Sequence, residues 1–139
     1  MRAPFTQLHV HLVWATWDRN AWLGPDMEAE LFAVLGAKAH ELKAQTLAIG
    51  GDFDHVHALV RIPPSLSVST FVGEMKGASS HWVNFVWRAP IRFQWQGAYG
   101  AFSVSPSDLE NVERYVRCQR EHHAARELWD EWEQTFLEG

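Results

Sequence analysis

Two short motifs place a pair of histidines one residue apart. His55 and His57 lie in GGDFDHVHALVRI, and His9 and His11 lie in HVHLVW. Residues two apart on a β-strand point to the same face, about 6.6 Å apart along the chain, so each pair can direct both imidazoles at one metal ion. Two imidazoles do not complete a metal site, and a third ligand has to come from elsewhere in the chain. Buried histidines that only form hydrogen bonds explain the same spacing, so the spacing alone leaves both interpretations open.

The local context distinguishes the two pairs. His55 and His57 follow an aspartate-containing turn and precede the more basic part of the chain. His9 and His11 lie in the first predicted strand and alternate with apolar residues, namely Leu8, Val10, Leu12 and Trp14. We therefore interpret His55 and His57 as the candidate metal ligands, and the first pair as structural or as a support for those ligands.

A tyrosine and a glutamine share one predicted helix. Tyr115 and Gln119 are four residues apart, which makes their side chains neighbours on a helix. The inward stripe of that helix is predicted to contain Leu109, Val112, Val116 and Gln119. A glutamine on the inward face needs a partner, and a metal held by the histidine pair would be one. The alternative is that Tyr115 is a core aromatic with its hydroxyl bonded to the backbone. The other tyrosine, Tyr99, lies in the glycine-flanked GAYGAF.

The elements that must position these side chains alternate between strand and helix patterns. Strands are predicted within 7–16, 45–51, 54–62 and 91–105. Helices are predicted over 26–44, 68–89, 107–124 and 127–138, with Ser107 and Glu110 in capping-box spacing. A glycine-containing turn joins the second and third strands into an antiparallel hairpin. The order predicts a single α+β domain over residues 1–139, a ferredoxin-like sandwich whose antiparallel sheet carries helices on one face.

Composition and charge narrow the class of protein. The net charge of −5 argues against a nucleic-acid partner, but residues 61–120 are net positive and both flanking parts are net negative. The single cysteine, Cys118, cannot form an internal disulfide. No apolar run approaches the ~20 residues of a membrane span, and the N-terminal stretch has no signal-peptide pattern. We expect a cytoplasmic protein.

An ordered set of motifs resembles the insertion-sequence-200-like transposases, which are single-tyrosine HUH enzymes (His, a bulky apolar residue, His). The chain is also similar to the relatives associated with repeated extragenic palindromes. The ordered combination covers almost the whole chain and is specific, although each motif is weak alone. The motifs are HLVWATWDR (11–19), GGDFDHVHALVRIPPSLSVS (50–69), MKGASSHWVN (75–84), WQGAYGAFSVS (95–105) and YVRCQREHH (115–123).

The resemblance implies a fold of the HUH endonuclease type and a role for each matching residue. His55, His57 and Gln119 are implied as ligands of Mg²⁺ or Mn²⁺, and Tyr115 as the nucleophile. The implied substrate is single-stranded DNA with hairpins, cleaved to a 5′-phosphotyrosine and a free 3′-hydroxyl. The resemblance also implies a homodimer, in which the tyrosine helix of one subunit can serve the histidine pair of the other.

Four basic residues are candidate DNA contacts, although a solvated helix surface explains them nearly as well. They are Lys76, Arg114, Arg117 and Arg120. His122 and His123 are candidates to support the metal ligands. The alternative function is a domesticated protein that binds hairpin DNA without transposing it, and a third possibility is a metalloprotein unrelated to DNA. The complete set of His55, His57, Tyr115 and Gln119 favours the enzyme.

Overall fold

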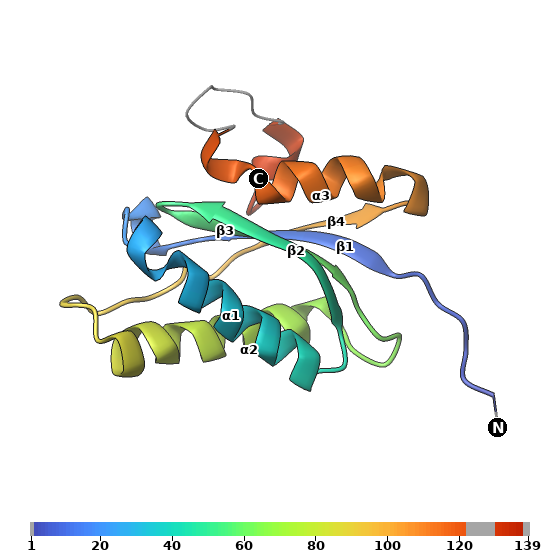
Figure 1. Cartoon of the computed structure of the whole chain (residues 1–139), viewed down its shortest axis with the longest axis horizontal. Helices are drawn as coiled ribbons and strands as arrows, with labels where there is room; N and C mark the ends of the chain where they lie inside the picture. The colour runs from blue at the N-terminus through green and yellow to red at the C-terminus, as the bar shows by residue number, and fades with distance from the viewer. Residues whose placement is uncertain (1, 122–129, 138–139) are drawn as a thin grey trace.

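The computed structural model describes residues 2–121 and 130–137. The four strands are β1 (His9–Ala15), β2 (Gln45–Asp52), β3 (His55–Arg61) and β4 (Gly100–Val104), all antiparallel in the order β2-β3-β1-β4. The main α-helices are α1 (Pro25–Glu41), α2 (Val68–His81) and α3 (Leu109–Arg117). Helices α1 and α2 cover one face of the sheet, and α3 and the C-terminal segment (residues 130–137) cover the other (Figure 1). None of the helices in the described part of the chain has the length and apolarity of a membrane span.

The alternation of side chains along β1 and β3 explains why both faces of the sheet are covered. Leu12 and Trp14 of β1 join the larger core beneath α1 and α2, as do Val56, Ala58 and Val60 of β3. Leu59 points the other way and packs with Val112 and Val116 of α3 in a second, smaller core. Because residues two apart share a face, His55 and His57 lie on the same side as Leu59. The histidine pair therefore lies beneath α3.

The predicted antiparallel sheet and the hairpin of β2 and β3 are confirmed. The expectation that the helices lie on one face holds for α1 and α2 and is wrong for α3 (Figure 1). The physical reason is that β3 is buried along both faces, since only Arg61 at its end is partly exposed. The face that carries His55, His57 and Leu59 therefore has its own cover, and Val112 and Val116 of α3 pack on Leu59.

The boundaries of the last two predicted helices differ in the structure. A 3-10 turn over Pro106–Asp108 precedes α3, so the helix begins at Leu109 rather than at residue 107. The predicted capping box does not form, because the N-cap position is Asp108, whose side chain makes no capping bond. Asp108 instead accepts a hydrogen bond from Ser105 at 3.0 Å. Within the final predicted helix, over 127–138, the described residues form the 3-10 turn η4 (Asp130–Glu133). Residues 122–129 lie outside the described residues, and they include His122 and His123 of the helix predicted over 107–124.

Two glycines allow the second layer to lie very close to the sheet. A Cβ atom on Gly50 of β2 would lie 1.7 Å from the carbonyl oxygen of Val116, and one on Gly100 of β4 would lie 1.9 Å from that of Gln134. Any side chain at either position would therefore displace the backbone that crosses it. These crossings bring α3 and the C-terminal segment down onto the face that carries the histidine pair.

Candidate metal and tyrosine site

The candidate site lies between the histidine face of the sheet and α3. His55 and His57 are almost completely buried, with 1% and 0% of their surface exposed. β1 contributes His11, which is also fully buried and lies on the same face of the sheet. α3 contributes Tyr115, and Gln119 follows just after the end of that helix.

His55 is held from both sides of its ring. Its Nδ1 lies 2.7 Å from a carboxylate oxygen of Asp54, the preceding residue. Its Nε2 faces the site, 3.3 Å from Oε1 of Gln119 and 3.4 Å from Oε1 of Glu133. A carboxylate that accepts from Nδ1 fixes the tautomer in which Nε2 carries the lone pair, which is the arrangement of a metal ligand.

His57 contacts a second histidine. Its Nδ1 lies 2.7 Å from Nε2 of His11, and its Nε2 lies 3.1 Å from Oε2 of Glu133. Burial, together with the charge that His57 carries when protonated, lowers the pKa of His11 to about 3, although Glu133 acts in the opposite direction. His11 is therefore neutral at neutral pH. Of the two histidines that the sequence suggested as structural or supporting, the structure brings His11 to the site.

Tyr115 of α3 contacts the carboxylate of Glu133. Its hydroxyl donates to Oε2 of Glu133 at 2.6 Å. The amide nitrogen of Gln119 donates to the carbonyl oxygen of Tyr115 at 2.9 Å, which directs Oε1 of Gln119 at His55. The tyrosine and the glutamine predicted from helix spacing are thus both brought to the histidine pair, within one chain.

Glu133 is the residue that sequence reasoning missed. It lies in η4, and 17% of its side chain is exposed. Burial alone would raise its pKa, but hydrogen bonding with His57 and Tyr115, and the charges that His57 and His55 carry when protonated, outweigh burial and lower the pKa to about 2. The carboxylate is therefore ionised at neutral pH. In the sequence it is one of several acidic residues near the C-terminus, and no spacing distinguishes it from the others.

The donors present fit a divalent metal ion. Ligand atoms of His55, His57 and Glu133 all lie within 4.8 Å of one another, so these three residues can hold a metal. The amide oxygen of Gln119 faces the same position, as its distance to His55 shows. A mixed set of imidazole nitrogens and oxygens suits first-row divalent ions such as Mn²⁺, and oxygen ligands also suit Mg²⁺.

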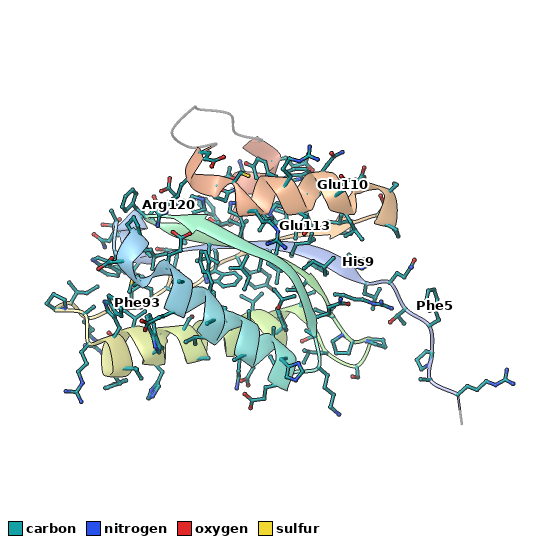
Figure 2. All side chains as sticks on the ribbon, in the orientation of Figure 1. Phe5, His9, Phe93, Glu110, Glu113 and Arg120 are labelled. Carbon is teal, nitrogen blue, oxygen red and sulfur yellow. The ribbon has the colours of Figure 1, made fainter. Side chains whose placement is uncertain are left out.

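Two of the predicted DNA contacts make intramolecular bonds. The ammonium group of Lys76 donates to two backbone carbonyl oxygens at 2.7 and 2.9 Å, and burial lowers the pKa of Lys76. Arg120 pairs with Glu28 at 2.6 Å and with Asp52 at 3.0 Å. Figure 2 shows Arg120 beside the start of α1, at the opposite end of the sheet from His9. Both residues tie parts of the fold together in this structure, and a DNA contact by either stays a prediction.

The other two basic residues lie on the exposed side of α3. Arg117 pairs with Glu113 at 2.9 Å and donates to the carbonyl oxygen of Leu47 at 2.7 Å. Arg114 is 3.6 Å from Glu110, and both side chains are largely exposed. Of the four basic residues predicted to contact DNA, Arg114 makes the longest intramolecular ion pair, at 3.6 Å.

Several known proteins similar to this chain are transposases. The family model described as "Transposase IS200 like" matches residues 4–119. The ISDra2 transposase TnpA of Deinococcus radiodurans is 25% identical over 121 residues, which cover 83% of this chain and 86% of that protein. The transposase of the insertion element IS200 of Salmonella typhimurium is 59% identical over 27 residues, 19% of this chain and 18% of that protein.

Solved structures share the fold. A crystal structure of a candidate transposase from Deinococcus radiodurans R1 is 26% identical with a TM-score of 0.67, covering 84% of this chain and 93% of that one. A REP-associated tyrosine transposase bound to a REP hairpin is 13% identical with a TM-score of 0.65, covering 88% of this chain and 73% of that one. The second likeness concerns the fold alone. Together they confirm the predicted fold class.

Proposed function

Because the chain belongs to the IS200-like transposase family, we propose that it cleaves and rejoins hairpin-containing single-stranded DNA with Tyr115 as the nucleophile. Membership of this family confirms the resemblance seen in the sequence motifs, and its relatives are named transposases, which bears out the expectation of an enzyme. The observation that carries the proposal is the meeting of two groups at one oxygen. The Tyr115 hydroxyl and Nε2 of His57 lie 2.6 and 3.1 Å from Oε2 of Glu133.

The proposed reaction exchanges one phosphoester bond for another. The Tyr115 oxygen attacks the phosphorus of a phosphodiester, a bond from that oxygen to phosphorus forms, and the bond from phosphorus to the 3′ oxygen breaks. Tyr115 loses one proton and the 3′ oxygen gains one, so the step is balanced. The products are a 5′-phosphotyrosine and a free 3′-hydroxyl. The covalent link retains a phosphodiester bond, so a 3′-hydroxyl can reverse the step without ATP.

A tyrosine hydroxyl has a pKa near 10 and needs help to attack at neutral pH. His55, His57 and Glu133, with Gln119 beside them, would hold Mg²⁺ or Mn²⁺. When bound there, a divalent ion would stabilise the negative charge that develops on the non-bridging phosphate oxygens. The chain's own contribution is to orient these donors, through Asp54 behind His55 and His11 behind His57.

The proposed substrate is supported by a structural neighbour that is itself bound to a REP hairpin. The second candidate function is a domesticated hairpin-binding protein without strand transfer. The Tyr115 hydroxyl is hydrogen-bonded to Glu133, which also belongs to the candidate set of metal ligands. This proximity of nucleophile and metal ligands favours the enzyme over that alternative. A cytoplasmic location stays a prediction.

A covalent adduct tests the proposal directly. Incubating the full chain and Mn²⁺ with a labelled single-stranded hairpin DNA should give an adduct that survives denaturation, with the 5′-phosphate on Tyr115 by mass spectrometry. Tyr115→Phe removes only the attacking oxygen and should abolish the adduct while retaining DNA binding. Tyr99→Phe is the control and should form the adduct normally. Hairpin binding by the wild type without any adduct would instead favour the domesticated binder.

A further inference from the structure

His11 lies directly behind the metal-ligand candidate His57. We propose that His11 is a positioning residue for His57: its Nε2 accepts the Nδ1 proton of His57 and so leaves the Nε2 lone pair of His57 directed at the position shared with His55 and Glu133. This inference rests on the proposed metal-dependent function for its purpose, but the hydrogen bond itself can be tested without a metal.

The rings of His11 and His57 are joined by a contact between two ring nitrogens. Nε2 of His11 lies 2.7 Å from Nδ1 of His57, and both side chains have no exposed surface. The opposite nitrogen of His57, Nε2, faces Glu133 at 3.1 Å. Nδ1 of His57 therefore contacts His11, and Nε2 of His57 faces the candidate metal site. The corresponding support for His55 is the 2.7 Å contact between its Nδ1 and Asp54.

The proton on the shared bond decides whether His57 can be a ligand. If His57 donates from Nδ1, its Nε2 has a free lone pair for a metal. If instead His11 donates to Nδ1, neutral His57 must carry its proton on Nε2, and that nitrogen cannot bind a metal. A metal ligand at His57 thus requires His11 to be the acceptor, with its own proton on Nδ1. Partners of this kind behind a ligating histidine fix its ring orientation and tautomer.

The surroundings of His11 are poorly suited to a merely structural histidine. Aromatic rings pack around it, with ring centroids of Phe102 at 5.8 Å, Trp132 at 5.5 Å and Tyr115 at 6.3 Å. Its Nδ1 has no hydrogen-bond partner among the described residues. A buried polar group left unsatisfied costs about 1–3 kcal/mol, so an apolar residue would suit this position better if packing were the only demand. The bond to His57 is what the imidazole adds.

The strand itself provides a matched control. His9 lies two residues earlier on β1, is also buried, and also has an Nδ1 without a partner among the described residues. It is paired with Arg61, whereas His11 lies next to His57. His9→Leu and His11→Leu therefore make the same chemical change on the same strand, and only the second removes a contact with a candidate ligand.

Two further variants separate the role of each ring nitrogen. Glutamine extends its amide to the position of Nε2, so His11→Gln retains an acceptor for His57. Asparagine extends its amide to the position of Nδ1, so His11→Asn does not. Mn²⁺ binding to the full chain, measured by calorimetry, should be about ten- to a hundredfold weaker in His11→Leu and in His11→Asn. His11→Gln should come close to wild type, and His9→Leu should bind Mn²⁺ normally.

Nitrogen-15 NMR of the histidine rings supplies the metal-independent measurement. In wild-type protein, His11 should carry its proton on Nδ1, with Nε2 as an acceptor, with or without Mg²⁺. A proton on Nε2 of His11 overturns the proposal. So does Mn²⁺ binding that is unchanged in a folded His11→Leu variant. If the wild type binds no Mn²⁺ but His11 shows the expected tautomer, the metal part of the proposed function fails and the positioning contact stands.

Discussion

A single carboxylate connects the side chains of this site. Oε2 of Glu133 accepts from Tyr115 at 2.6 Å and lies 3.1 Å from His57, while its Oε1 lies 3.4 Å from His55. The lowered pKa of Glu133 reflects the same contacts, which together outweigh the effect of burial. The charge of this carboxylate is therefore stabilised by the groups that it would help to bind to a metal.

Glu133→Gln should weaken Mn²⁺ binding by at least about tenfold, because the substitution keeps the size of the side chain and removes its negative charge. Calorimetry measures this change. Glu131→Gln alters an exposed acidic residue in the same 3-10 turn and should leave the affinity unchanged. Equal Mn²⁺ affinity in Glu133→Gln and wild type would remove Glu133 from the ligand set and leave Gln119 as the third ligand.

The basic residues near Tyr115 should differ in what they support. Arg120→Gln breaks two ion pairs and should lower the free energy of unfolding by about 1–3 kcal/mol. Arg114→Gln should leave the thermal stability unchanged and reduce by about one the slope of log affinity for hairpin DNA against log salt concentration. Thermal melting and fluorescence anisotropy measure the two effects. A stability-neutral loss of DNA affinity in Arg120→Gln would reverse this assignment.

At the scale of elements, the position of α3 on the sheet decides where the nucleophile lies. Gly50 lets the backbone of α3 cross β2 at a distance that no side chain would permit. Val112 and Val116 of α3 then pack against Leu59 of β3, the strand that carries both metal-ligand candidates. Tyr115 is buried beside them on the same helix. The position of α3 on the sheet thus sets the distance between Tyr115 and the histidine pair.

Gly50→Ala should displace α3 and sharply reduce adduct formation, because the new Cβ would lie 1.7 Å from the carbonyl oxygen of Val116. Overpacking of this kind costs about 1–3 kcal/mol or more, which urea unfolding measures. Gly36→Ala in α1 meets nothing within 4 Å and should stabilise the protein by about 0.5–1 kcal/mol with normal adduct formation. A Gly50→Ala protein with wild-type stability and activity would show that α3 is not held at this crossing.

At the scale of the whole molecule, one chain assembles the candidate site. Tyr115 reaches Glu133, His57 and His55 of its own chain, so the composite arrangement implied by the resemblance is not required to bring these groups together. A homodimer stays a prediction. The two edge strands, β2 and β4, are the parts of the sheet open to pairing with a second copy. Light scattering at micromolar concentration measures the oligomeric state.

Mixing two inactive variants tests whether the tyrosine acts within its own chain. A His55→Ala chain keeps its tyrosine, and a Tyr115→Phe chain keeps its histidine pair. If Tyr115 serves only its own chain, neither chain of a mixed sample has a complete site, and the mixture should form no adduct. Recovery of adduct in the mixture, with each variant inactive alone, would show instead that α3 exchanges between subunits.

The sequence by itself determined the local parts of this protein. The spacing of His55 and His57 on a strand and of Tyr115 and Gln119 four residues apart predicted which side chains face the same way, because the strand and helix periods are set by the backbone. The same periods predicted the four strands and the antiparallel hairpin.

Only the tertiary structure decided which of these faces meet. It placed α3 on the opposite face from α1 and α2, so that β3 is buried on both sides. It also joined His57 to His11, 46 residues earlier, and to Glu133, 76 residues later. No local period links residues so far apart, and their contact depends on close packing at Gly50 and Gly100.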